Sequence, residues 1–173
     1  GRLPAHIVAA LAHHFYEAAR GGDVNEQAMS YAVQAGQHAS AMMAYEEAKA
    51  HYTRPVALIA LLHPTDARQQ SGLRVALGIA QAQAGEIPQA RETLLRAAEV
   101  ARRVGAPELL TQAALGFEKM GVDTGVVDQR LVVLLEEALN TLGEQESALQ
   151  ARLLARLAQE LHYAVGSGAR RVT

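Results

Sequence analysis

Seven histidines are the side chains of this sequence best suited to hold a metal ion: His6, His13, His14, His38, His51, His63 and His162. Metal ligands on a helix usually stand four residues apart, as in His-Glu-x-x-His, so that both side chains share a face. No two of these histidines have that spacing, and the adjacent His13 and His14 point to different sides of a helix. We therefore predict no metal site and assign the histidines to packing or to the surface.

Paired carboxylates are the second candidate for chemistry, because general acid–base catalysis uses two acidic groups that converge in a pocket. Adjacent glutamates occur at 46–47 and 136–137, each beside alanine-rich sequence that is typical of a solvated helix face. Arginines and glutamates mix over residues 91–103, which predicts surface ion pairs rather than an anion site. The sequence contains no cysteine that could act as a nucleophile or zinc ligand. We predict no enzyme activity and no cofactor.

The composition narrows the class of protein further. Half of the 173 residues are hydrophobic, but only 4% are aromatic, so the apolar content is mostly alanine and leucine. Both are strong helix formers, which predicts an all-α protein. The formal net charge of −2, with both signs interspersed, argues against nucleic acid as a direct partner. No apolar run reaches the roughly 18 residues of a membrane span and no signal peptide is recognisable, so we expect a cytoplasmic protein without a membrane partner.

A recurring spacing indicates how the helices are arranged. Small and apolar residues return at relative positions 0, 12, 16 and 19, with three more loop residues in the last copy: Gly36, Ala48, Tyr52 and Pro55; Gly78, Ala90, Leu94 and Ala97; Gly116, Leu131, Leu135 and Ala138. Self-similarity at roughly 34 to 42 residues in helix-forming sequence is typical of stacked helix pairs. We expect each glycine to leave room for the partner helix, and the residue 16 positions later to fill the space between adjacent pairs.

Capping residues and helix breakers divide the chain into about eight helices. The expected helices are 4–20, 24–42, 45–62, 66–84, 88–104, 107–121, 127–142 and 146–165. Short loops make neighbouring helices antiparallel, which predicts a right-handed α-solenoid. A single domain would cover 1–165, with repeats at about 29–62, 66–104 and 107–143, flanking helices at 4–20 and 146–165, and a flexible tail at 166–173. Because the chain begins without methionine and ends in that polar tail, we expect it to be a segment of a longer protein.

Pro55 departs from the repeat because it stands in the middle of the helix expected at 45–62. Proline there removes a backbone hydrogen bond and clashes with the preceding turn, at a cost of about 3 kcal/mol in a regular helix. We therefore expect a kink or a break near His51 to Arg54. A bent helix that curves the stack is the plainer interpretation, and a hinge that moves on partner binding is the alternative.

The repeated residues resemble the tetratricopeptide repeat (TPR). Residues at that family's small and large consensus positions are Leu77, Gly78, Gly85, Ala90, Leu94 and Ala97. The run from Ala44 to Ala48 is similar to the usual opening of the second helix of a repeat, whereas Arg74 stands where the family often has tryptophan. The resemblance implies antiparallel helix pairs that bind other proteins.

The chain also resembles the helical-repeat part of large bacterial transcriptional regulators of the LuxR type or linked to nucleotide cyclases. The stretches that carry this resemblance are 11–15, 44–48, 77–85 and 113–116. Those regulators join an ATPase module to a long helical-repeat region, and the resemblance places this segment after that module. The phosphate-binding pattern Gly-x-x-x-x-Gly-Lys-Ser/Thr does not occur in this sequence. The implied function is an interaction module of a larger signalling or transcriptional regulator.

In tetratricopeptide stacks the first helix of each pair lines the concave face, and this resemblance selects the expected binding residues. They are Val33, Gln37, Ser40, Val75, Ile79, Ala82, Gln83, Ala113, Phe117 and Met120. The set is apolar with a few amides and lacks the Lys and Asn cluster that would hold a C-terminal carboxylate. It favours an amphipathic helix of a protein, a peptide or another domain of the parent chain. The alternatives are a small-molecule effector in the same groove, burial of these residues by neighbouring helices, and a homo-oligomer formed through exposed ends of the stack.

Overall fold

The computed structural model describes residues 10, 26–62, 66–120, 127–142 and 147–168. Within these ranges all regular structure is helical, with seven α-helices, one 3₁₀ turn and no strand. The elements are α2 (Glu26–Ala41), α3 (Tyr45–Leu62), α4 (Ala67–Gln83), α5 (Ile87–Arg103), α6 (Pro107–Gly116), η1 (Phe117–Lys119), α7 (Gln129–Thr141) and α8 (Ser147–Gly168). The predicted all-α class is confirmed for these residues, whereas the helix expected at 4–20 lies outside them apart from residue 10.

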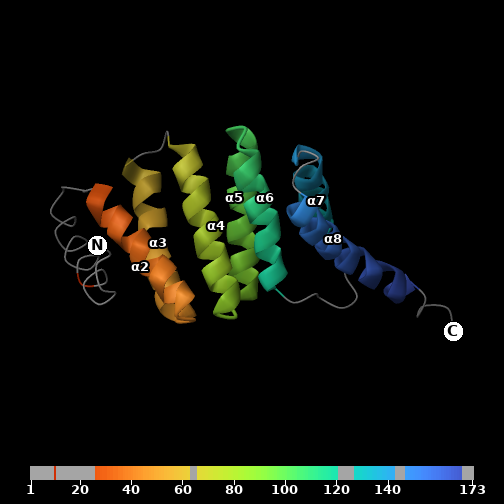
Figure 1. Ribbon diagram of the computed structural model, residues 1–173, viewed down its shortest axis with the longest axis horizontal. Helices are drawn as coiled ribbons and strands as arrows, with labels where there is room; N and C mark the ends of the chain where they lie inside the picture. The colour runs from red at the N-terminus through yellow and green to blue at the C-terminus, as the bar shows by residue number, and fades with distance from the viewer. Residues whose placement is uncertain (1–9, 11–25, 63–65, 121–126, 143–146, 169–173) are drawn as a thin grey trace.

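The helices stand side by side in a row that runs from α2 at one end to α8 at the other (Figure 1). Each helix packs against the next one in sequence, and α4 also contacts α6, as α6 contacts α8. We refer to α2–α3, α4–α5 and α6–α7 as helix pairs. Of their first helices, α4 and α6 contact each other.

Local sequence signals explain where several helices begin. The Asp66 side chain caps α4 by accepting a hydrogen bond from the Gln69 backbone N–H at 3.0 Å. Asp128 caps α7 in the same way through the N–H of Arg130, at 3.1 Å. Prolines occupy the first turn of both α5 and α6. Backbone N–H groups in a first turn have no hydrogen-bond partner within the helix, so proline, which lacks an N–H, loses no helical hydrogen bond there. These caps satisfy backbone donors that helix N-termini otherwise leave unpaired.

The turns that follow α2, α4 and α5 share one backbone hydrogen-bond pattern. In each, a backbone N–H bonds to the carbonyl five residues earlier: Ala44 to Ala39, Glu86 to Gln81, and Ala106 to Ala101. The residue before that N–H has positive φ, and it is Gly85 (84°) or Gly105 (60°) in two of the turns but Met43 (59°) in the first. Glycine is preferred there because a Cβ is strained in the left-handed region.

The repeated spacing of the sequence produces the expected close contacts in the first two pairs. A Cβ built on Gly36 would lie 2.7 Å from Cζ of Tyr52, and one on Gly78 would lie 2.7 Å from Cγ of Leu94. The third copy differs, because a Cβ on Gly116 would lie 2.8 Å from Cδ1 of Leu94. The nearest side chain to Gly116 is therefore the leucine of the preceding pair, and Leu94 fills the space between adjacent pairs as the repeat predicts. Leu94 is thus enclosed by glycines of both α4 and α6.

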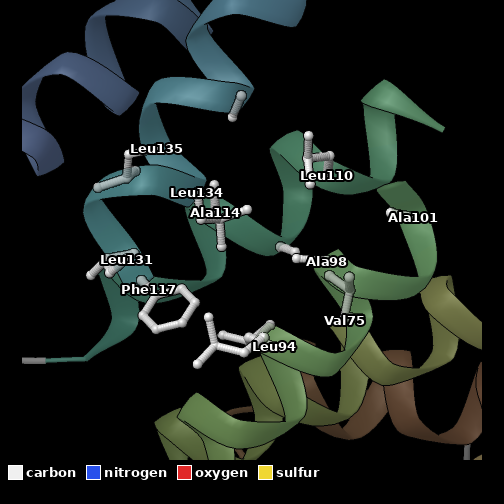
Figure 2. Close-up of a cluster of buried hydrophobic side chains, with 14 of the residues drawn as sticks. Val75, Leu94, Ala98, Ala101, Leu110, Ala114, Phe117, Leu131, Leu134 and Leu135 are labelled. Atoms are coloured by element: carbon white, nitrogen blue, oxygen red, sulfur yellow. The ribbon is translucent and has the colours of Figure 1, made fainter. Parts of the chain in front are cut away.

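The largest buried cluster spans α4 to α8 and is centred on the pairs α4–α5 and α6–α7. Figure 2 shows Leu94, Phe117 and Leu131 within this cluster, with Leu134 and Leu135 above them on α7. A smaller cluster around Tyr52 joins α2, α3 and α4. All the non-glycine residues of the three copies of the repeat are buried. The repeat therefore marks core positions along the length of the stack.

The helix α3 contradicts the break expected near His51 to Arg54, because it continues through Pro55 to Leu62. The proline ring is fully buried, so its apolar contacts offset part of the cost of the missing hydrogen bond. Two residues before the proline, the hydroxyl of Thr53 donates to the carbonyl oxygen of Lys49 at 2.8 Å. The helix thus accommodates proline without ending.

Two helix ends differ from the sequence-based expectation. The helix expected to reach residue 121 ends at Gly116, and the tighter turn η1 follows before Met120 adopts extended backbone. This turn brings the side chains of both Phe117 and Met120 into the core. At the other end, α8 continues to Gly168, beyond the end expected near 165. A single glycine costs a helix about 1 kcal/mol, which does not by itself end it.

Buried charges attach α8 to the stack. Arg156 and Glu160 are each 5% exposed and form an ion pair of 2.9 Å within α8. The other carboxylate oxygen of Glu160 accepts the backbone N–H of Asp128 at 2.9 Å, and Asp128 in turn pairs with Arg91 of α5. Leu154, also on α8, is 54% exposed. The buried pair fixes the position of α8, because leaving either charge alone in the interior is costly.

Candidate binding groove

Two hollows open among the first helices of the pairs. The first, which we call the polar hollow, has a volume of about 1100 Å³ and lies among α2, α4 and α6. Its lining mixes apolar side chains with amides, a hydroxyl and charges: Met29, Ser30, Val33, Gln34, Gln37, Asp66, Arg68, Gln69, Leu73, Glu108 and Leu109. No residue of α3 or α5 takes part in it.

The second hollow, which we call the apolar cavity, has a volume of about 530 Å³ and lies among α4, α6, the end of α7 and the start of α8. It is lined by Val75, Ile79, Pro107, Glu108, Thr111, Gln112, Leu115, Gly116, Thr141, Leu142, Leu149 and Arg152. A volume of this size falls within the roughly 300–1,000 Å³ that is typical of ligand sites. The position of α8 sets one wall, so the buried charges described above also shape the cavity.

The two hollows meet at Glu108, which lines both of them. We call the two hollows together the groove; they lie over α2, α4 and α6, with α8 at one end. The groove changes character along its length, because the end over α2 carries amides and charges and the end over α8 is mostly apolar. A binding partner long enough to cover both ends would itself need one polar and one apolar end.

The two arginines of the groove have acidic partners. Arg152 bonds both carboxylate oxygens of Glu118, at 3.1 Å from Nε and 2.6 Å from Nη2. These hydrogen bonds raise the pKa of Arg152 above its ordinary value. Arg68 donates from Nε to Glu108 at 3.1 Å. The positive charge of each guanidinium is therefore already balanced by a carboxylate of the protein.

Two threonines of the apolar cavity differ in their hydrogen bonding. The hydroxyl of Thr141 donates to the carbonyl oxygen of Ala138 at 2.9 Å. Thr111 is 4% exposed, and its hydroxyl oxygen has no hydrogen-bond partner. Buried hydroxyls are nearly always paired with protein or water, so Thr111 is the less ordinary of the two.

The structure divides the binding residues predicted from the sequence into three groups. Four of them line the groove, two in each hollow: Val33, Gln37, Val75 and Ile79. Four are enclosed in the core: Ala82, Ala113, Phe117 and Met120. Two line neither hollow: Ser40 and Gln83. Ser40 instead forms a hydrogen bond with the hydroxyl of Tyr52.

Two of the expected residues of α2 line a hollow and none of those of α6 does, and the packing of Gly116 explains the difference. The residues three before and one after the repeated glycine line the groove in α2 and α4. In α6 the same positions are Ala113 and Phe117, which are buried and line neither hollow, whereas Val75 of α4 is also buried but lines the apolar cavity. Because Gly116 faces Leu94 of the preceding pair, α6 presents Thr111 and Leu115 to the groove instead. The sequence-based prediction missed these residues, although their spacing of four places them on one helix face.

Comparison of the chain with family models, with curated proteins and with solved structures finds no match. The tetratricopeptide resemblance therefore stays a prediction. In the described part of the chain, no helix is long and apolar enough to span a membrane. Across the same residues, no three histidines or acidic side chains gather as metal ligands would.

Proposed function

We propose that this chain is a right-handed α-solenoid of the tetratricopeptide type and serves as an interaction module of a larger bacterial regulator. The observation that carries the proposal is the pair of hollows that share Glu108, one among α2, α4 and α6 and the other among α4, α6 and the adjoining ends of α7 and α8. Stacked helix pairs use such extended surfaces to bind other proteins. The partner is a protein segment, either from another protein or from another domain of the parent chain.

The chemistry of the groove indicates what kind of segment would bind. An amphipathic helix laid along it would place apolar side chains against Leu115 and Leu149 and polar ones against Gln34 and Gln69. Helix-in-groove recognition of this kind relies on a few apolar anchors at helical spacing. A partner held by its C-terminal carboxylate fits less well, because Arg68 and Arg152 are already paired. The module would act by exchanging this segment between bound and free states.

The proposal is tested by site-specific photo-cross-linking of the full-length protein in the cells that make it. A cross-linking amino acid replaces Gln69 in the polar hollow, Gln112 in the apolar cavity, or Glu136, which is exposed on α7 outside the groove. We expect adducts of one and the same partner, or of one parent segment, from the first two positions and none from Glu136. Equal adducts from all three positions, or none from Gln69 and Gln112, would contradict the proposal.

A binding measurement with the purified protein and the purified partner segment completes the test. The segment identified by cross-linking is titrated against the protein and against Leu115→Arg, which places a charge in the apolar part of the groove. We expect the variant to bind at least about tenfold more weakly, because an unpaired charge is costly in an apolar site. Unchanged affinity would show that the segment binds elsewhere.

Small-molecule sensing is a second candidate function, and the apolar cavity is the observation that favours it. Its volume suits a ligand of moderate size, and its lining combines apolar walls with a few polar side chains, among them Gln112 and Thr141. A bound effector would occupy the end of the groove next to α8 and compete there with a protein segment. Direct binding of small probes to the cavity tests this function separately from the cross-linking experiment.

A further inference from the structure

The helix α8 turns its charges toward the stack and apolar side chains toward solvent, which reverses the usual pattern of a surface helix. Its sequence contains two arginines and one glutamate. Arg156 and Glu160 are buried, and Arg152 pairs with Glu118 of η1. On the opposite side of the helix, over residues 151–161, the exposed residues are Ala151, Leu154, Ala155, Ala158 and Leu161.

The exposed face of α5 shows how different this is. Its residues Glu92, Arg96 and Glu99 share one face at helical spacing, and all three are charged. On α8, by contrast, Leu154 is 54% and Leu161 is 43% exposed, with only alanines between them on the same face. Single exposed leucines are common on protein surfaces, but a continuous apolar stripe without a charge is typical of an interface.

The exposed apolar residues of α8 recur with the spacing of a coiled-coil seam. Intervals of three, four and three residues separate the members of the series, which we call the outer seam: Ala151, Leu154, Ala158 and Leu161. This spacing keeps side chains on one line along a helix that packs against another helix. Alanine and leucine alternate in the outer seam, so it presents small and large positions in turn.

The order of small and large residues is self-complementary when two copies of α8 run antiparallel. Reversing the outer seam about its middle places Ala151 of one copy opposite Leu161 of the other, and Leu154 opposite Ala158. Each leucine then packs against an alanine, so that the two surfaces interdigitate. A parallel arrangement would place leucine opposite leucine and leave voids between the alanines. Since the outer seam is uncharged, two copies of it can meet without repulsion.

We propose that two copies of this chain associate through α8, in an antiparallel and two-fold symmetric contact along the outer seam. Such a contact uses the same surface on both copies, so it closes as a dimer and does not extend into a filament. One helix from each copy makes a small interface, so the dimer should dissociate on dilution. This inference goes beyond the proposed function, because no residue of the outer seam lines the groove.

Sedimentation velocity of the protein, at concentrations from micromolar to near-millimolar, tests the association. We expect an equilibrium between monomer and dimer. Ala158→Arg should raise the dissociation constant at least about tenfold, because it places an unpaired charge opposite Leu154 of the second copy. Ala50→Arg is the matched control, since Ala50 is also an exposed alanine within a helix, and it should not change the dissociation constant. Circular dichroism of both variants checks that they remain folded.

Cysteine cross-linking tests the antiparallel arrangement. The sequence contains no cysteine, and Ala155 is exposed within one residue of the middle of the outer seam. The two-fold axis therefore brings this position near its own copy, and a disulfide requires Cβ atoms roughly 3.5–4.5 Å apart. With oxidised glutathione as the oxidant, Ala155→Cys should become a covalent dimer. Ala50→Cys should remain a monomer under the same conditions.

Three outcomes would overturn the inference. A protein that stays monomeric at every concentration would show that the outer seam does not bind a second copy. A dimer that Ala158→Arg does not weaken would place the interface elsewhere, and equal cross-linking of Ala155→Cys and Ala50→Cys would contradict the two-fold arrangement. None of these outcomes affects the proposed function, which depends on cross-linking from Gln69 and Gln112 in the groove.

Discussion

Gly36 and Gly116 occupy the same place in the repeated spacing, yet they pack against different helix pairs. The first faces Tyr52 of its own pair, and the last faces Leu94 of the pair before it. In the first case the glycine lets two partner helices approach, and in the second it lets two neighbouring pairs approach. Equal spacing in the sequence therefore secures a close contact but does not decide which helix makes it.

This difference has a consequence for the groove. The contact of Gly116 with Leu94 sets the face that α6 turns outward, so that Thr111 and Leu115 line the apolar cavity and Phe117 is buried. In α2, Gly36 faces Tyr52 of its own pair, and Val33 and Gln37 line the polar hollow, where the tetratricopeptide resemblance places them. The apolar cavity thus arises where the third copy departs from the first two.

Among the substitutions that test this difference, Leu94→Ala should have the largest effect on stability, because the Leu94 side chain lies against the glycines of two helices. We expect Leu94→Ala to lower the free energy of unfolding by about 2–5 kcal/mol through a buried void. The exposed Leu154 provides the control, and Leu154→Ala should change stability by no more than about 0.5 kcal/mol. Urea denaturation measures both, and a loss below about 1 kcal/mol for Leu94→Ala would show that the contact relaxes easily.

Alanine at Gly36 tests the contact of the first pair. The added Cβ would lie 2.7 to 3.0 Å from three atoms of the Tyr52 ring, so we expect Gly36→Ala to cost about 1–3 kcal/mol by overpacking. Gly72 is the matched control, since its Cβ would meet Leu109 at an ordinary 3.8 Å. There the gain in helix propensity should dominate, and Gly72→Ala should stabilise by about 0.5–1 kcal/mol. Thermal unfolding measures both variants. A shift of their unfolding temperatures in the same direction would contradict the account.

Glycine at Met43 would make the turn of the first pair like that of the second. Met43 has the positive φ that Gly85 has after α4, and its side chain is 73% exposed, so little packing is lost on replacement. We expect Met43→Gly to stabilise the protein by about 1 kcal/mol, which corresponds to roughly 2–4 °C in Tm. Met42→Gly, next to it, should give no such gain. A lower Tm for Met43→Gly would indicate that the methionine makes stabilising contacts.

The smallest expected effect concerns the pH dependence of stability through His51. This histidine stands 15 residues after Gly36, and the equivalent position of the second pair is Thr93. Burial lowers the pKa of His51 below its ordinary 6.5, against the opposing influence of Glu47. The unfolded chain therefore binds this proton more readily, and stability should fall as the pH drops below about 6.5. His51→Gln should weaken that dependence. Unfolding temperatures at several pH values between about 5 and 8 measure it, and identical profiles for both proteins would contradict the assignment.

Much of the fold could be predicted because its determinants are local. The Asp66 cap, the prolines that open α5 and α6, and the glycine turns after α4 and α5 all act within a few residues. The burial of the repeated positions also follows from helical spacing. The early end of α6 could not be predicted in this way, since η1 depends on where Phe117 and Met120 find space in the core.

The candidate groove was less predictable because it depends on how helix pairs face one another. Val33 and Val75 were expected from the tetratricopeptide resemblance, whereas Leu142 and Leu149 lie at the end of α7 and near the start of α8, which that resemblance did not select. The pairing of Arg152 with Glu118 joins residues 34 apart in sequence on different elements. Residue spacing within one helix cannot predict a contact between two different elements.

The orientation of α6 is the central claim, and cysteine labelling tests it directly. The sequence contains no cysteine, so each single variant reports on one position. A small maleimide is applied to Leu115→Cys and Ala113→Cys, which differ in facing the groove or the core of the same helix. We predict rapid labelling at position 115 and protection at position 113 until the protein unfolds. Equal rates, or faster labelling at position 113, would contradict the orientation of α6 and with it the placement of the apolar cavity.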